Sequence, residues 1–187
     1  MQIVLISRLF FPLICLSFYM ISPLTASASE SAFEQTPAGV IEVKTIPACT
    51  VLVKRSQVPY FESNNLFMPL FWYITTRRIA MTTPVEVGIQ PGEMYFYVGS
   101  DAAQRSLKSS GSVSVEQLPL RTVASIAYQG AYSERNFQRA KTKLEDWIAQ
   151  QDEYQACGEA RAIYWDSPSV PDAKKHAEVH ISLKSLN

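Results

Sequence analysis

The two histidines of this chain are the residues best able to do chemistry, because imidazole can bind a metal or carry a proton near neutral pH. His176 and His180 are four residues apart, a spacing that places both side chains on one side of a helix. Residues 177–182 instead alternate apolar and polar side chains, which indicates a strand. A zinc site is therefore not expected. If Val179 and Ile181 face the core, His180 faces solvent or a groove.

No sequence pattern of a catalytic centre is present. The chain lacks Gly-x-Ser-x-Gly and His-Glu-x-x-His, and it has no glycine motif for phosphates or dinucleotides. Glu62, Glu86 and Glu145 could each act as an acid or a base, but nothing singles out one of them. No catalytic residue is assigned, and enzymatic activity stays an open question.

A short apolar segment, residues 66–74, carries side chains that could form either a core face or a ligand face. Phe67, Leu70, Phe71 and Ile74 recur at helical spacing. Pro69 is tolerated only in the first turn of a helix. The segment therefore predicts a short helix. An apolar stripe of this kind packs into a core more often than it binds a cofactor.

The remaining pattern predicts strands and a second helix. Ser133 is a suitable N-cap, and the apolar face of the helix that follows it consists of Phe137, Ala140, Leu144, Trp147 and Ile148. Alternating or compact apolar runs predict strands at residues 40–46, 50–56, 79–85, 93–98, 113–118, 122–128, 161–164 and 177–182. The Ser- and Gly-rich residues 99–112 read as a linking loop.

These elements occur twice in the same order. The string at 46–51 aligns with that at 118–123, which divides the chain into repeats at about 40–98 and 113–184. The pattern predicts an α+β fold of duplicated β-α-β-β units, with an antiparallel sheet and one helix per repeat. A ligand groove is expected where the two repeats meet.

The first 28 residues differ from the rest. Arg8 precedes an apolar run that ends in Thr25-Ala-Ser-Ala28, the small-x-small pattern of a cleavage site. The run is too short for a spanning helix. We expect a signal peptide at 1–28 cleaved after Ala28, a flexible lead-in at 29–39 and one domain at 40–187. The protein would then be periplasmic or secreted, and would meet the membrane only through its signal peptide.

Charge and cysteine content bear on the partners of the protein and on a possible disulfide bond. With 17 basic and 17 acidic residues and no basic stripe, a nucleic-acid partner is not expected. Outside the leader, Cys49 and Cys157 could pair in an oxidising compartment or stay as small buried residues. The sequence leaves both alternatives open.

Two regions resemble the SOUL haem-binding family. Residues 66–74, followed by Arg78-Ile-Ala-Met-Thr-Thr-Pro-Val85, resemble its helix and its Lys-Ile-Ala-Met-Thr-x-Pro-Val strand. Residues 162–168 and Glu178-Val-His-Ile181 resemble its closing segments, with His180 in place of the usual Trp. The likeness spans about residues 40–184. It implies a fold shared with effector-binding domains of the gyrase-inhibitor type.

The resemblance implies non-covalent binding of haem or another tetrapyrrole in an apolar groove. Covalent attachment is excluded because Cys-x-x-Cys-His is absent. His180 is then a candidate axial ligand, and Arg78, Lys54 and Arg77 are the nearest partners in sequence for the propionates. The other candidate contacts are Phe67, Met68, Leu70, Phe71, Ile74 and Met81.

Two alternative functions use the same groove. The chain could bind another apolar small molecule, with haem bound only weakly. It could also be a hydrolase, since some members of the wider superfamily are. Residues 161–164 lack the glutamate with which related effector-binding domains meet cationic drugs, which lowers the expectation of a cation sensor.

Overall fold

The computed structural model describes residues 30–62 and 65–186, so the expected leader at 1–28 lies outside the described part. The helical elements are α1 (Phe67–Thr76), α2 (Ser100–Ala103), α3 (Glu134–Ile148) and the 3-10 turn η1 (Asp172–Lys174). The strands are β1 (Ile41–Ile46), β2 (Cys49–Arg55), β3 (Val85–Gly88), β4 (Glu93–Tyr97), β5 (Ser114–Leu118), β6 (Arg121–Gln129), β7 (Tyr154–Ala156), β8 (Arg161–Tyr164) and β9 (His176–Ser185).

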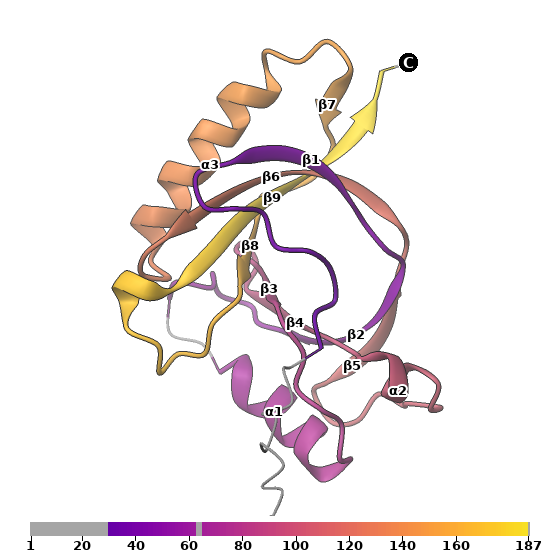
Figure 1. Cartoon of the computed structure of the whole chain (residues 1–187). Coiled ribbons are helices and arrows are strands. Elements are labelled where there is room, and N and C mark those ends of the chain that lie inside the picture. Colours follow the sequence, from indigo (N-terminus) through magenta and orange to yellow (C-terminus); the bar gives the residue numbers. More distant parts are fainter. Residues whose placement is uncertain (1–29, 63–64, 187) are drawn as a thin grey trace, which may run out of the picture.

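The strands form one antiparallel sheet that curls like a half-barrel (Figure 1). Its order is β1-β6-β9-β8-β3-β4-β2-β5, and β7 pairs with the far end of β9. The N-terminal and C-terminal halves are interleaved: β1 pairs with β6, β3 with β8, and β2 with β5. The expected α+β class is confirmed, whereas a duplicated unit is not evident from the pairing alone.

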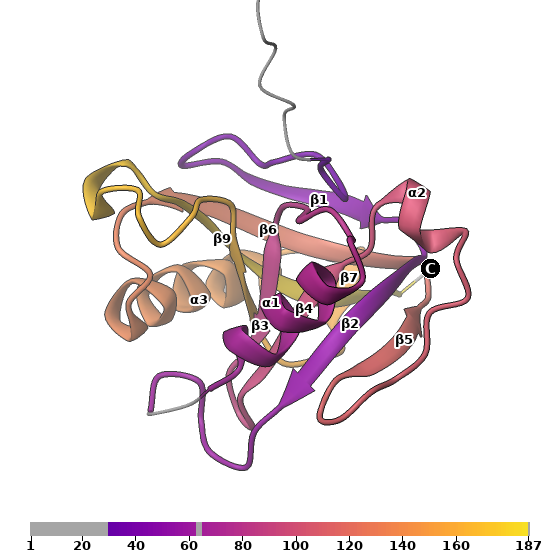
Figure 2. The same cartoon turned by 90° about the horizontal axis from the view of Figure 1, so that it is seen from below.

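The two faces of the sheet have different chemistry. On the outer face, side chains from alternate strand positions pack with α1 and α3 into one large apolar core, as Phe96 and Val179 do. Figure 2 shows α1 lying across the strands β2, β3 and β4. On the inner face, Val51, Val53, Tyr95 and Tyr97 form a second, smaller cluster.

Helix α1 is short because both of its ends are constrained by sequence. Pro69 occupies its first turn, where the missing N–H does no harm. Arg78 adopts a left-handed conformation with φ of 53°. The Ile79 N–H donates to the Ile74 carbonyl (2.9 Å) and the Arg78 N–H donates to the Thr75 carbonyl (3.2 Å). This is the Schellman arrangement that ends a helix.

Helix α3 confirms the predicted amphipathic pattern. The Ser133 side chain accepts a hydrogen bond from the Asn136 backbone N–H at 3.3 Å, so the predicted N-cap is correct. The residues Phe137, Ala140, Leu144 and Ile148 are buried against the sheet, and Trp147 is half-buried at the edge of the core.

The chain before β1 packs inside the curl of the sheet (Figure 1). We call residues 30–37 the lead-in segment. The Glu30 carboxylate accepts hydrogen bonds from the Ser100 N–H, and the Ala32 N–H donates to the Thr83 carbonyl at 2.8 Å. Thr36 is 1% exposed. The expectation of a flexible lead-in was therefore wrong for these residues, because buried polar and aromatic contacts hold them.

Some element boundaries also differ from the expectation. The strand expected at 79–85 begins only at Val85, since residues 79–84 run as an extended connection. The loop expected at 99–112 contains the short helix α2, and strand β7 was not predicted. Within the described residues, no helix has the length and apolar character needed to cross a membrane.

Candidate ligand-binding site

A pocket of about 450 Å³ lies beside α1 on the outer face of the sheet. We call it the α1 pocket. One wall comes from α1 and the other from the end of β8, while the extended connection before β3 forms the floor. Its lining residues are Phe67, Phe71, Met81, Thr82, Thr83, Val85, Tyr164, Trp165, Asp166, Ser167 and Pro168.

The α1 wall is aromatic. The rings of Phe67 and Phe71 stack with their centroids 5.7 Å apart and an interplanar angle of 17°. Phe67 also contacts Phe96 of β4 edge to face, which fixes its ring against the core. Phe71 remains 38% exposed, and this exposure is costly for an aromatic side chain unless a ligand covers it.

The floor of the pocket presents a thioether. Met81 is half-buried and packs against the outer core. The next residue, Thr82, is anchored by a hydrogen bond from its hydroxyl to the Tyr97 carbonyl at 2.5 Å. Because this bond fixes the backbone beside it, the position of Met81 is defined by the fold.

The opposite wall was missed as a site by sequence reasoning, although residues 162–168 carried part of the family resemblance. Tyr164 stacks on Tyr132 with centroids 4.0 Å apart. Burial raises the pKa of the Tyr164 phenol far above its usual range, so the group stays protonated. Asp166 accepts hydrogen bonds from the backbone N–H of His176 (2.6 Å) and lies 3.0 Å from its Nδ1.

The structure divides the remaining predicted contact residues among different places. Leu70 and Ile74 are buried in the core, at 0% and 4% exposure, so they support the pocket wall without lining it. Met68 is 43% exposed and lines a separate depression with Tyr60 and Phe61. These positions are corrected from ligand contacts to core or neighbouring surface, because only one edge of α1 borders the pocket.

The predicted basic partners do not line the α1 pocket. Arg78 lies beside Glu30, Asp101 and Arg105 in another depression. Lys54 on β2 is half-buried outside the pocket. The Arg77 guanidinium stacks on the Tyr73 ring at 3.9 Å. Proximity in sequence was a poor guide here, since Met81 lines the pocket whereas Arg77 and Arg78, only a few residues earlier, do not.

His180 is also absent from the α1 pocket. Val179 and Ile181 face the outer core as expected, so His180 lies on the inner face. It is 3% exposed there, beneath Phe33 of the lead-in segment, whose ring centroid lies 5.6 Å away. Burial lowers the pKa of the imidazole more than its contact with Glu178 raises it, so His180 is neutral. Axial ligation of a group in the α1 pocket by His180 is therefore excluded.

Glu178 organises the polar cluster around His180. Its carboxylate is fully buried and accepts hydrogen bonds from Thr36, Lys44, Ser125, Trp165 and His180, with the Lys44 Nζ at 2.8 Å. Burial opposes ionisation, but the contacts with His180 and Lys44 outweigh it and lower the pKa to about 2. The carboxylate only accepts, so the His180 Nε2 donates.

A second buried carboxylate, Glu86, lies on the same inner face. It forms ion pairs with Arg121 and Arg161 and accepts a hydrogen bond from the Tyr97 hydroxyl. Burial again opposes ionisation, yet the two guanidinium groups lower the pKa of Glu86 to about 2. The chain's own cations thus neutralise the buried carboxylates of the inner face. This face therefore stabilises the fold and is not an open binding site.

The two cysteines are free in the structure, so the candidate disulfide is not formed. Cys49 is half-buried on β2 opposite Leu118 of β5. Cys157 is exposed, and its N–H donates to the Ser182 carbonyl beside β9. The different strand neighbours separate the two thiols. Within residues 30–62 and 65–186, no group of three or more His, Cys, Asp or Glu side chains could hold a metal ion.

Comparisons with solved structures define the class of fold. The crystal structure of the EcmrR C-terminal domain matches with a TM-score of 0.64 and 19% identity, covering 79% of this chain and 98% of that one. A hydrolase from Listeria innocua matches with a TM-score of 0.57 and 7% identity, covering 80% and 94%. In the EcmrR–DNA complex, the match spans 58% of the longer chain, at a TM-score of 0.64 and 18% identity. These likenesses show the fold alone.

The family follows from the sequence comparison. The model of the SOUL heme-binding protein family matches residues 30–182. The chain therefore belongs to the SOUL family, as the motifs at 66–85 and 162–181 indicated. No curated protein sequence matches the chain.

Proposed function

We propose that this protein binds haem or a related tetrapyrrole non-covalently in the α1 pocket. The observation that carries the proposal is the stacked pair Phe67 and Phe71, which borders a pocket of about 450 Å³ in a member of a haem-binding family. This volume lies within the range of about 300–1,000 Å³ that small-molecule sites occupy. A flat macrocycle can lie against the partly exposed Phe71 ring.

The lining of the pocket determines how the macrocycle would be held. Met81 offers the one sulfur atom among the lining residues and is the candidate axial ligand. The Tyr164 phenol is protonated and is a poor anionic ligand. No Lys or Arg lines the pocket, whereas Asp166 does. We therefore expect the propionates to point toward solvent, away from Asp166.

A haem titration of residues 29–187, followed by absorbance in the Soret region, tests the proposal. We expect a saturable change at one haem per chain. Phe71→Ala should weaken binding several-fold, since full burial of an aromatic side chain contributes about 1.5–3 kcal/mol and a ligand would cover only the 38% that is exposed. Met81→Leu should shift the Soret band if the thioether ligates iron.

Met68→Leu is the matched control, because Met68 is on the same helix surface but outside the α1 pocket. It should leave both the affinity and the spectrum unchanged. A non-saturating titration, or equal behaviour of the wild type and Phe71→Ala, would contradict haem binding here. A saturable response to another apolar ligand, with none to haem, would favour the alternative that the pocket binds a different small molecule.

The proposal includes export. Residues 1–28 have the composition of a cleavable leader, and Glu30, the first residue that the structure describes, accepts hydrogen bonds from the Ser100 N–H. Cleavage after Ala28 would leave the lead-in segment intact. Mass spectrometry of the N-terminus after expression with fractionation tests this: a mature chain beginning at Ser29 in the periplasm or medium supports it, and an intact leader in the cytoplasm contradicts it.

Hydrolysis beside the same pocket is a second candidate, favoured by a contact of 3.0 Å between Asp166, which lines the pocket, and the Nδ1 of His176, which does not. A carboxylate in this position orients an imidazole so that its other nitrogen can act as a base. A screen of p-nitrophenyl esters tests this idea. Turnover that is lost in His176→Ala and reduced in Asp166→Asn would support it, and no turnover above buffer would refute it.

A further inference from the structure

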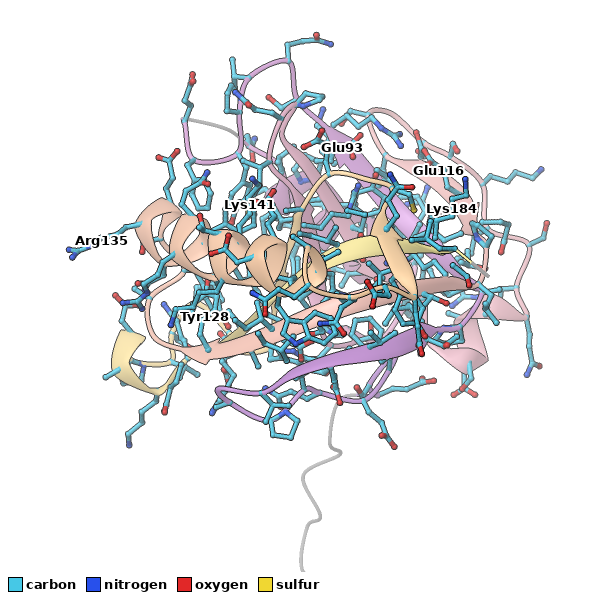
Figure 3. All side chains as sticks on the ribbon, turned by 90° about the horizontal axis from the view of Figure 1, so that it is seen from above. Glu93, Glu116, Tyr128, Arg135, Lys141 and Lys184 are labelled. Atoms are coloured by element: carbon cyan, nitrogen blue, oxygen red, sulfur yellow. The ribbon has the colours of Figure 1, made fainter. Side chains whose placement is uncertain are left out.

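A second pocket, of about 430 Å³, lies between α3 and the β1–β6 edge of the sheet. We call it the α3 pocket. It shares no lining residue with the α1 pocket. Figure 3 shows Tyr128 on the β1 side of α3, whereas Lys141 lies on the other side of the helix. The lining residues are Gly39, Ile41, Ile126, Ala127, Tyr128, Gln129, Asn136, Arg139, Ala140 and Lys143.

The inner end of the α3 pocket is apolar. Ile41 and Ile126 are direct partners across the β1–β6 ladder, so their side chains lie next to each other on the outer face. Ala140 of α3, 5% exposed, faces them across the pocket. Its small side chain leaves the space that a larger residue would fill. This end therefore suits an alkyl or aryl group.

A tyrosine, Tyr128, forms part of the wall. The Tyr128 hydroxyl is buried and has no hydrogen-bond partner among the described residues. Because this hydroxyl has almost no accessible surface, a ligand in the pocket would meet the rest of Tyr128 and not its hydroxyl. Burial raises the pKa of this phenol to about 12, more than the nearby charge of Arg139 lowers it. The group is therefore protonated and uncharged at neutral pH.

The outer end of the pocket is cationic. Arg139 and Lys143 are four residues apart on α3 and therefore project from the same side of the helix. Neither forms an ion pair with any residue that the structure describes, and Arg139 contacts only the Asn136 side-chain oxygen, at 3.3 Å. No Asp or Glu lines the pocket. The two cations lack a counter-charge.

We propose that the α3 pocket binds a small amphipathic carboxylate, such as a medium-chain fatty acid. The tail would lie against Ile41, Ile126 and Ala140. The carboxylate would meet Arg139 and Lys143 at the mouth, where charge-assisted hydrogen bonds are strong. A ligand amine would face two cations and is disfavoured, and a neutral alcohol would leave both cations unpaired.

Calorimetric titration of residues 29–187 with octanoate, octanol and octylamine tests the charge and the tail separately. We expect saturable binding of one octanoate per chain, at least tenfold weaker binding of octanol, and none of octylamine. Arg139→Ala combined with Lys143→Ala should weaken octanoate binding at least tenfold. Both residues are exposed, so the variant should fold normally. Tyr128→Phe should bind octanoate within twofold of the wild type, because its hydroxyl is buried and the carboxylate lies at the mouth.

Lys141→Ala is the matched control on the same helix, since Lys141 pairs with Glu145 at 2.7 Å and does not line the pocket. It should bind octanoate within twofold of the wild type. Equal affinities for octanoate and octanol would overturn the proposal. So would full binding in the double variant, or an equal loss in Lys141→Ala. Haem titrations of the same variants should be unaffected, which separates this site from the α1 pocket.

Discussion

The buried carboxylate of Glu178 makes a quantitative prediction about acid stability. Its pKa is lowered from 4.5 to about 2 in the folded chain. Between these two pKa values the unfolded chain binds more protons than the folded chain. The contribution of Glu178 to the free energy of unfolding is therefore fully present above pH 4.5 and is lost as the pH falls toward 2. The full contribution is about 3 kcal/mol, at about 1.4 kcal/mol for each pKa unit.

The assay is urea unfolding at pH 7 and pH 3.5. Linkage with these pKa values removes about 1 kcal/mol of the Glu178 contribution at pH 3.5. Glu178→Gln should lower the free energy of unfolding at pH 7 by about 3 kcal/mol, because its amide nitrogen would face either the N–H groups of Thr36 and Trp165 or the Lys44 ammonium, none of which can accept. The amide does not titrate, so the difference in the free energy of unfolding between wild type and variant should narrow by about 1 kcal/mol at pH 3.5.

Glu145→Gln serves as the control, since Glu145 is 48% exposed and pairs with Lys141 only at the surface. It should change stability by less than about 0.5 kcal/mol at both pH values. A gap between wild type and Glu178→Gln that is equal at pH 7 and pH 3.5 would refute the reasoning. That result would mean that Glu178 is not an ionised, charge-paired carboxylate in the folded chain.

Three further predictions concern packing and the backbone, each measured by urea unfolding. Phe33→Ala should lower the free energy of unfolding by about 2 kcal/mol, because the Phe33 ring contacts Tyr97, Trp165 and His180. An unchanged free energy would mean that the lead-in segment does not pack inside the curl of the sheet. Leu70→Ala should lower the free energy of unfolding by about 3 kcal/mol and Phe71→Ala by less than about 1 kcal/mol, since only Leu70 is fully buried. Equal losses would contradict the assignment of Phe71 to the pocket wall. Arg78→Gly should raise the free energy of unfolding by about 0.5–1 kcal/mol, because glycine adopts the left-handed conformation without strain. A destabilised variant would mean that residue 78 does not adopt this conformation.

Local sequence determined the helices α1 and α3 and much of the sheet. The period of the apolar residues in α3 and the N-cap Ser133 were sufficient to place that helix and its buried face. The string at 78–85 identified the family because it is unusual and continuous, and the family model agrees. Alternation in residues 177–182 correctly placed Val179 and Ile181 on one face of the strand and His180 on the other, since side-chain direction in a strand alternates strictly.

Only the tertiary structure decided what covers the opposite face of β9. The Thr36 N–H donates to Glu178 across 142 positions of sequence, and no local pattern reports such a contact. Phe33 and Thr36 bury His180, which sequence reasoning had placed in solvent or in a groove. In the same way, Tyr164 and Trp165 meet Phe71 only after β8 pairs with β3. Periodicity fixes the direction of a side chain relative to its own element, whereas its neighbours depend on how distant elements pack.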